Sequence, residues 1–198
     1  CWSPELYLLV AVAYIGGTNN RIITSPDGIN WTTRNSGPDN LFNSIVWSPE
    51  LRLFVACGGG TNTGIITSPD GINWTARKTP NSNNWWAVCW CPEIHLFVSV
   101  NTSAEVMTSP DGINWTYKKK FSPASYLRSI AWSPQLYRFV TVAYYNGYKI
   151  LVSGDPNPKP VNSFGLDLYT GSGGLNVIAP VVNKEVVWTT RLSAADNE

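Results

Sequence analysis

Charge is the scarcest property of this sequence. Charged side chains make up 14% of its 198 residues, and 14 Lys and Arg nearly balance 13 Asp and Glu, whereas soluble domains carry roughly 25% charged residues. The net charge of +1 leaves no basic face for nucleic acid, so we expect no nucleic-acid partner. The longest apolar stretch, 6–15, falls short of the roughly 20 residues of a membrane helix, so we expect no membrane insertion.

Metal-ligating side chains are also few, since the chain has four Cys and one His. Their spacing matches no metal-binding pattern, so we expect no metal and no cofactor. Cys1, Cys57 and Cys89 occupy repeat positions where other units carry small apolar residues, which predicts buried free thiols. Cys91 replaces a turn Ser, and nothing in the sequence requires a disulfide.

The single histidine, His95, has Tyr7, Arg52 and Tyr137 as its counterparts in other units, which we interpret as a solvent-facing strand position. A catalytic triad or a metal-ligand role is therefore not expected for it. An initiator Met is absent and the chain begins in the middle of a repeat unit, so we interpret the sequence as a fragment, a processed form or an incompletely known sequence.

Aromatic and turn-forming residues are plentiful. The chain contains 10 Trp, 16 Gly and 14 Pro, and 13% of its residues are aromatic. Hydrophobic residues make up 43%, which is enough to build a core. No segment shows a sustained 3.6-residue apolar period, so this composition indicates an all-β chain with many turns.

Two motifs recur along the chain. Trp-Ser-Pro-Glu-Leu and its close variants occupy 2–6, 47–51, 90–94 and 132–136. Ser-Pro-Asp-Gly-Ile-Asn-Trp-Thr occupies 25–32, 68–75 and 109–116. The repeat unit is about 43 residues long, in the range of propeller blades. The predicted units are about 1–40, 41–83, 84–125 and 126–155.

Each unit fits a four-stranded meander. In the second unit we expect strands at 43–47, 51–57 and 65–67, and a fourth that carries 73–75. Asp-Gly between the last two is a strong hairpin signal. Four short strands per unit of this length are typical of a β-propeller blade, because stacked sheets bury the apolar face that one sheet leaves exposed. We therefore predict an all-β propeller of about four four-stranded blades, with a larger ring as an alternative.

The repeated hairpin resembles the Asp-box, or BNR, repeat of sialidases and related propellers. It departs from the family pattern because the Gly directly follows the Asp and the Trp arrives one residue early. The resemblance implies a structural hairpin at the blade periphery, away from any active site. We expect the Asp carboxylate to accept backbone N–H groups two or three residues on, the Gly to adopt positive φ and the Trp to cover the hairpin. The matching positions are Ser25, Asp27, Gly28, Trp31, Ser68, Asp70, Gly71, Trp74, Ser109, Asp111, Gly112 and Trp115.

Catalytic residues are not evident. A sialidase needs an arginine cluster, a Tyr nucleophile with a carboxylate partner, and an acid, and none of the Arg residues lies in such a context. Six of the 13 acidic residues belong to the two repeated motifs, whereas a catalytic residue should break the repeat. We predict that the protein is not an enzyme, with sialidase-type glycoside hydrolysis as the third-ranked function.

Binding residues are expected where the copies differ. Four residues before the first-strand Trp the units carry Asn43, Trp86 and Arg128, which share no chemistry, near the expected mouth of the channel. The preceding position is apolar in every copy, which predicts core; it holds Phe42, Trp85 and Leu127.

Loops also vary between copies, at 14–21, 58–64, 101–105 and 144–148. They are rich in Gly, Asn, Thr and Tyr, which suit contacts with carbohydrate or protein. We predict a ligand site at Trp86, Arg128, Asn43, Tyr144 and Tyr145.

The segment 156–198 departs from the repeat, because three prolines follow the degenerate fourth hairpin. We predict a C-terminal β extension that either closes the ring or forms a stalk or docking arm for a homo-oligomer. Near its end, 185–190 fits either an outer strand like 30–34 or an inner strand like 45–47.

The leading functional hypothesis is a non-catalytic binding or adhesion module on an extracellular or virion surface, with a protein or a glycan as its partner. Repeats of this type resemble those of bacterial surface and phage proteins. The alternative is a structural building block of a phage or viral fibre or particle.

Overall fold

The structure is a computed structural model, and it describes residues 1–14, 20–37, 40–59, 64–121, 125–145, 150–153 and 188–191. This part of the chain contains sixteen β-strands and one 3-10 turn, η1 (Pro92–Ile94). The strands form four antiparallel sheets of four, each hydrogen-bonded in chain order as a meander. The fold is therefore all-β, as predicted.

The first two sheets follow the first two sequence units. The first consists of β1 (Trp2–Ser3), β2 (Leu8–Val12), β3 (Ile22–Ser25) and β4 (Thr32–Arg34). The second consists of β5 (Leu41–Ser48), β6 (Leu53–Gly59), β7 (Ile65–Ser68) and β8 (Thr75–Arg77). Strand β8 begins at Thr75, so Asn73 and Trp74 belong to the hairpin, and not to the strand as predicted.

The third and fourth sheets continue the pattern. The third consists of β9 (Trp85–Cys91), β10 (Leu96–Asn101), β11 (Glu105–Ser109) and β12 (Thr116–Lys120). The fourth consists of β13 (Ser125–Ser133), β14 (Arg138–Tyr145), β15 (Ile150–Ser153) and β16 (Trp188–Arg191).

Strand β16 decides between the inner and the outer strand that the sequence allowed near the end of the chain. It pairs with β15 as the outer strand of the fourth sheet, with Val152 opposite Thr189 and Ile150 opposite Arg191. Its residues, Trp-Thr-Thr-Arg, are identical to 31–34, whose strand β4 pairs with β3 in the same register. The rest of the 156–198 extension lies outside the described residues, and so does its ring-closing or docking role.

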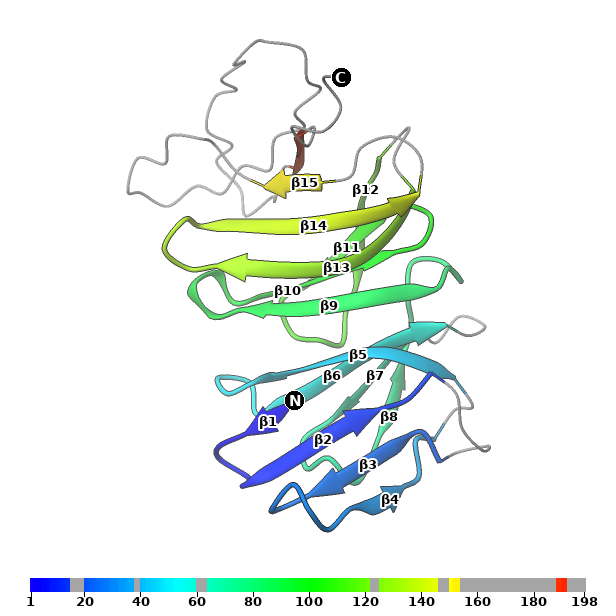
Figure 1. Cartoon of the computed structure of the whole chain (residues 1–198), viewed down its shortest axis with the longest axis vertical. Coiled ribbons are helices and arrows are strands. Elements are labelled where there is room, and N and C mark those ends of the chain that lie inside the picture. The colour runs from blue at the N-terminus through cyan, green and yellow to red at the C-terminus, as the bar shows by residue number, and fades with distance from the viewer. Residues whose placement is uncertain are drawn as a thin grey trace.

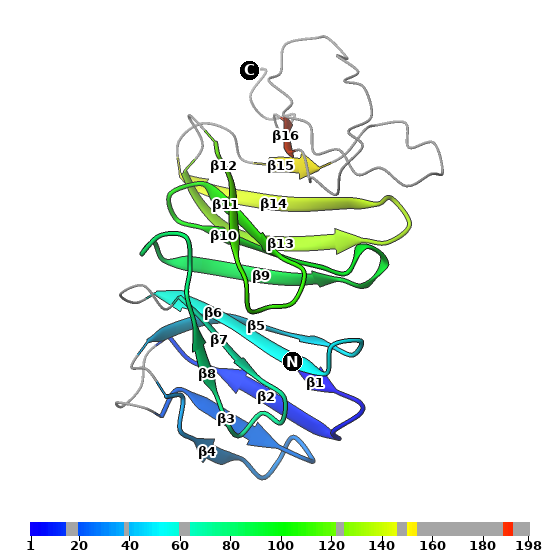
Figure 2. The ribbon, with the colours of Figure 1, turned by 180° about the vertical axis from the view of Figure 1, so that it is seen from behind.

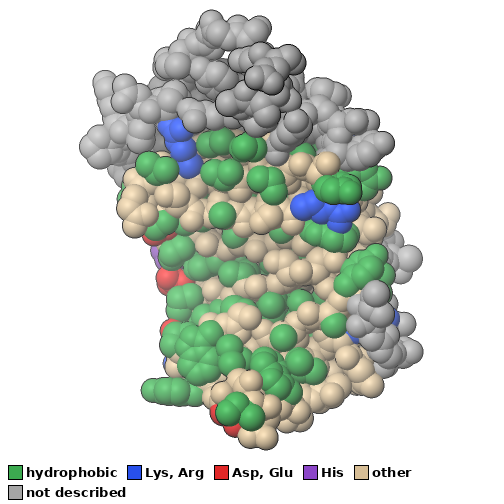
Figure 3. Space-filling view, in the orientation of Figure 1, with side chains coloured by type: hydrophobic (Ala, Val, Ile, Leu, Met, Phe, Trp, Pro, Cys, Tyr) green, Lys and Arg blue, Asp and Glu red, His purple; other side chains and the backbone are tan. Residues whose placement is uncertain are grey.

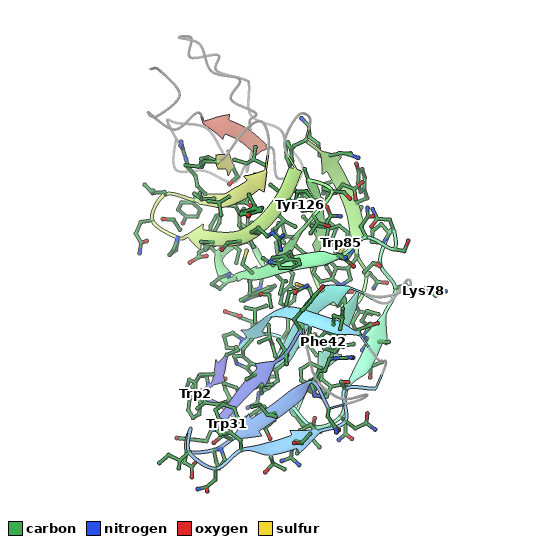
Figure 4. The ribbon with its side chains drawn as sticks, turned by 45° about the vertical axis from the view of Figure 1, so that its right-hand side comes forward. Trp2, Trp31, Phe42, Lys78, Trp85 and Tyr126 are labelled. Atoms are coloured by element: carbon green, nitrogen blue, oxygen red, sulfur yellow. The ribbon has the colours of Figure 1, made fainter. Side chains whose placement is uncertain are left out.

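The four sheets stack face against face, with the first and the fourth at opposite ends (Figure 1). The view from behind shows the same order (Figure 2), and an oblique view shows the stack curving into an arc (Figure 4). Strands β5, β9 and β13 neighbour one another along the inside of the arc. This arrangement is that of consecutive propeller blades.

The core lies between the sheets as three separate clusters. Val10 and Ile22 of the first sheet pack against Trp47, Phe54 and Ile66 of the second. The second and third sheets meet through a cluster that includes Val55, Cys57, Trp90, Phe97 and Met107, and the third and fourth through one that includes Val98, Val100, Phe139 and Leu151. Phe42, Trp85 and Leu127 are fully or almost fully buried, as predicted.

The repeated hairpins have one hydrogen-bond pattern. In the second sheet, Asp70 Oδ1 accepts the backbone N–H groups of Ile72 and Asn73, each at 2.8 Å, and Ser68 Oγ accepts that of Gly71 at 2.8 Å. The Trp74 indole donates to the Gly71 carbonyl at 3.1 Å. The other two hairpins repeat these bonds, and the three glycines have φ between 72° and 75°. The Ser, Asp, Asn and Trp side chains of the motif all form hydrogen bonds within the hairpin, which supports a scaffold role.

The positions shared with His95 lie in turns, and not on a strand as predicted. Tyr7, Arg52, His95 and Tyr137 are exposed, and all have φ of 48–50°. Each closes the turn between the first two strands of its sheet, where the chain must reverse within a few residues. The prediction of solvent exposure is confirmed, but their backbone is left-handed.

Candidate functional site

A β-bulge occurs at the same place in three innermost strands. In β5 the register passes from Phe42 to Ser44, which leaves Asn43 unpaired. In β9 it passes over Trp86, and in β13 over Arg128. A bulge turns the extra residue out of the regular alternation of the strand. The three variable positions predicted from sequence are therefore the three bulged residues.

The bulges of β9 and β13 bring Trp86 and Arg128 together. The Arg128 guanidinium carbon lies 3.8 Å from the centre of the Trp86 ring. The rings of Tyr126 and Tyr144 flank it, each at 5.6 Å. Tyr14 packs against Trp86, and the centroids of the two rings are 5.8 Å apart. We call these five residues, from three sheets, the aromatic–arginine cluster.

Backbone contacts and a buried ring hold the residues around the cluster. Tyr126 has a left-handed backbone, with φ of 56°, and its N–H donates to the Thr102 carbonyl of the third sheet at 3.0 Å. Trp85, beside Trp86, is fully buried and anchors the start of β9. Asn43 does not join the cluster, but its amide donates to the Trp85 carbonyl at 3.2 Å and ties β5 to β9. Figure 4 shows Trp85 and Tyr126 close together on one side of the arc.

The cluster is accessible from outside. Tyr126 is 42% exposed and Tyr144 is 75% exposed, while Trp86 and Arg128 are half-buried. In Figure 3 a Lys or Arg side chain lies among hydrophobic ones over the ends of β13 and β14. A cation stacked on aromatic faces is stabilised by about 0.5–2 kcal/mol. Within the part of the chain that the structure describes, the Arg128 guanidinium has no ion pair or hydrogen bond, so its N–H edge is free for a ligand.

Sequence reasoning found three members of the cluster and missed two. Trp86, Arg128 and Tyr144 were predicted together with Asn43. Tyr14 opens a variable loop, and Tyr126 directly precedes the core position Leu127, but neither is among the residues predicted to bind a ligand. The side chain of Tyr145, the fifth predicted residue, lies outside the described residues.

Glu105 forms a second cluster that breaks the repeat. Its carboxylate is buried, and Oε2 accepts the side-chain amides of Asn81, Asn83 and Asn101 at 2.6–2.8 Å. Such donors satisfy a buried carboxylate without a cation. They also tie the segment before β9 to the third sheet, so Glu105 supports the start of the strand that carries Trp86.

The described residues meet the requirements of neither a metal site nor a membrane-spanning helix. No group of three or more His, Cys, Asp or Glu side chains there has a geometry suited to a metal ion. No helix among those residues is long and apolar enough to span a membrane.

The thiols are free in the described ranges. Cys57 and Cys91 are buried and Cys89 is half-buried, in line with the buried-thiol prediction for Cys57. Cys1 is exposed, which corrects that prediction for the first unit, because Cys1 precedes β1 and is not held within a strand as Cys57 is.

The sequence matches no protein-family profile and no curated protein. Among solved structures it is similar to a chain of the nidogen–laminin complex, with a TM-score of 0.56 and 12% identity over 74% of this chain and 56% of that one. It is also similar to YCF48 bound to a D1 peptide, with a TM-score of 0.52 and 15% identity over 79% of this chain and 49% of that one. The chain thus spans about half the length of these structures. At such identities the similarity establishes the β-propeller fold, and the likeness to Asp-box repeats rests on the hairpin motif.

Proposed function

We propose that this chain is a non-catalytic protein-binding module and that its partner binds at the aromatic–arginine cluster. The observation that carries the proposal is the half-buried Arg128 guanidinium, held 3.8 Å from the centre of the Trp86 ring and without an acidic partner among the described residues. Tyr, Trp and Arg are the residues that dominate binding energy at protein interfaces.

The chemistry of the cluster suits a peptide segment that carries a carboxylate. Stacking between rings fixes the plane of the guanidinium, and its planar fork of N–H donors matches a carboxylate in a bidentate arrangement. The exposed rings of Tyr126 and Tyr144 add apolar surface beside it. The solved structures cited above include one protein in complex with laminin and one bound to a peptide, which supports a protein partner.

The test is an array of random peptides probed with the purified chain. We expect the bound peptides to be enriched in Asp, Glu or free carboxyl termini. Arg128→Gln should lower their affinity at least tenfold, about 1.4 kcal/mol, and Arg128→Lys should recover only part of it because Lys lacks the planar fork. Arg52→Gln, in an exposed turn away from the cluster, is the matched control and should bind as the wild type does. Absence of binders, or binders indifferent to Arg128, would contradict the proposal.

A glycan is the second candidate ligand, favoured by the exposed rings of Tyr126 and Tyr144. Aromatic faces of this kind stack on sugar rings. For either kind of ligand, we propose that the protein is located outside the cell or on a virion surface. A glycan array separates the candidates, because sugar binding that survives Arg128→Gln and is lost in Tyr144→Ala would favour the glycan.

A further inference from the structure

Each contact between neighbouring sheets joins two different faces. We call the side of a sheet that carries the first-strand Trp its leading face; in the second sheet it holds Trp47, Phe54 and Ile66, which pack on Val10 and Ile22 of the first. The opposite side is the trailing face; in the second sheet it holds Val55, Cys57 and Ile65, which receive the third sheet. Every junction inside the chain therefore places a leading face on a trailing face.

One hydrogen bond repeats at all three junctions. The Trp indole of a leading face donates to the turn Glu of the preceding sheet. Trp47 donates to Glu5 at 2.7 Å, Trp90 to Glu50 at 2.8 Å and Trp132 to Glu93 at 2.7 Å. A charge-assisted bond of this kind fixes the register of one sheet on the next.

No described sheet packs on the leading face of the first sheet. Trp2 and Trp31 are each 42% exposed. At the matching positions of later sheets, Trp47, Trp90 and Trp115 are 6–9% exposed, and Trp74 and Trp132 are half-buried. Within the described ranges the Trp2 indole has no acceptor. Figure 4 shows Trp2 and Trp31 at the same end of the arc.

No described sheet packs on the trailing face of the fourth sheet either. Val140 and Val142 are 37% and 41% exposed, whereas their counterparts Val55, Cys57, Val98 and Val100 are fully buried. Gln135 stands where the earlier turns carry Glu, and its amide oxygen can accept an indole N–H in the same way. One end of the arc thus carries the donor and apolar surface that match the other end.

We propose that a second copy of the chain docks on these two faces, the leading face of each copy on the trailing face of the other. Two copies related by a two-fold axis then make two identical junctions and close a ring of eight sheets, within the range of known propellers. Each junction repeats one already present three times inside the chain.

The primary test is the molar mass of the purified chain across a concentration series, measured by sedimentation equilibrium. We expect a monomer–dimer equilibrium that ends at the dimer. A monomer at every concentration would overturn the proposal, and so would an open series of higher oligomers, because unclosed contacts add copies without limit.

Two variants locate the junction. Trp2→Asp places a charge on the leading end and Val142→Asp places one on the trailing end, and each should raise the dimer dissociation constant at least tenfold. Ile72→Asp is the matched control, since Ile72 is 45% exposed on the hairpin of an internal sheet, and it should dimerise as the wild type does. Loss of dimer in the control, or no loss in the variants, would overturn the proposal.

Mixing the two variants distinguishes a blocked face from a misfolded chain. Each variant keeps one intact end, so an equimolar mixture should form a heterodimer through a single junction. Two misfolded chains cannot restore each other. Absence of the heterodimer at the highest soluble concentration would overturn the proposed pairing of faces.

Discussion

One Asp carboxylate fixes the geometry of each hairpin, and the hydrogen bonds that it accepts lower its pKa. Partial burial alone would raise the pKa of Asp70, but hydrogen bonds from the backbone and side chain of Asn73, from Ile72 and from Ser68 outweigh burial and lower that pKa to about 2. The pKa of Asp111 is lowered to about 2 by the same balance of burial and hydrogen bonds. Because the ionised form is the one that is bonded, the hairpins are held by charge.

Acid should therefore loosen the fold through these residues. A carboxylate whose pKa is lower in the folded chain than its ordinary 3.8 contributes stability above about pH 4, and loses it as the pH falls toward 2. In the Asp70→Asn, Asp111→Asn double variant, the free energy of unfolding should fall less between pH 4 and pH 2 than it does in the wild type. Denaturant unfolding across this pH range measures the difference, and parallel curves for the two proteins would contradict the assignment.

The cysteines differ in burial, and we therefore expect them to differ in reactivity. Burial raises the pKa of the Cys57 thiol to about 12, and it raises the pKa of Cys89 and Cys91 as well. Only the thiolate is nucleophilic, so buried thiols react slowly. Cys1 is exposed.

A thiol reagent at about pH 8 should label Cys1 rapidly and the other three only after denaturation. Ellman's reagent with and without guanidinium measures this. In Cys1→Ser the rapid phase should vanish, and a rapid phase that persists would show that an internal thiol opens readily.

At the scale of the element, the hairpin is pressed against the preceding sheet. A Cβ added at Gly71 would lie 2.8 Å from Leu8 Cδ2 and 3.2 Å from Val10 Cγ2 in the first sheet, whereas one at Gly28 would meet only Leu9 of its own sheet, at 3.3 Å. Both glycines have positive φ, which is unfavourable for other residues by about 1–2 kcal/mol.

Gly71→Ala should therefore destabilise the chain more than Gly28→Ala, by about 1 kcal/mol, because it adds crowding between sheets to the backbone strain. Chemical denaturation of both variants measures the difference. Equal losses would mean that the hairpin does not bear on the preceding sheet.

The bulges are the elements that create the candidate site. In a regular strand, Trp86 and Arg128 would alternate with their neighbours across the sheet, and they would face the junctions between sheets. The extra residue in β9 and in β13 turns both away from the core. The Trp85 ring and the Leu127 side chain fill the core positions beside them.

For the whole molecule, the two proposals reinforce each other. A two-fold axis along the channel would place both aromatic–arginine clusters at the same end of a closed ring. A partner with two binding segments would then bind with an effective concentration set by the distance between the clusters. Disruption of the ring should lower the binding of such a partner more than that of a single peptide.

The blades could be predicted from the sequence, because their chemistry is local. Asp-Gly hairpins, turn prolines and Trp at fixed spacing specify strands and reversals within one unit, and stacking of such units follows from their apolar faces. The sequence also identified Trp86 and Arg128 as positions that break the repeat.

Which of these residues meet could not be predicted before the sheets were placed in space. Trp86 and Arg128 are in contact because the bulges of the adjacent strands β9 and β13 turn both side chains to the same side. Tyr14, which follows β2 of the first sheet, packs on Trp86. Likewise, 188–191 became an outer strand only through pairing with β15, since its sequence fits an inner or an outer strand. Such contacts depend on the position of one sheet relative to the next, which no local pattern encodes.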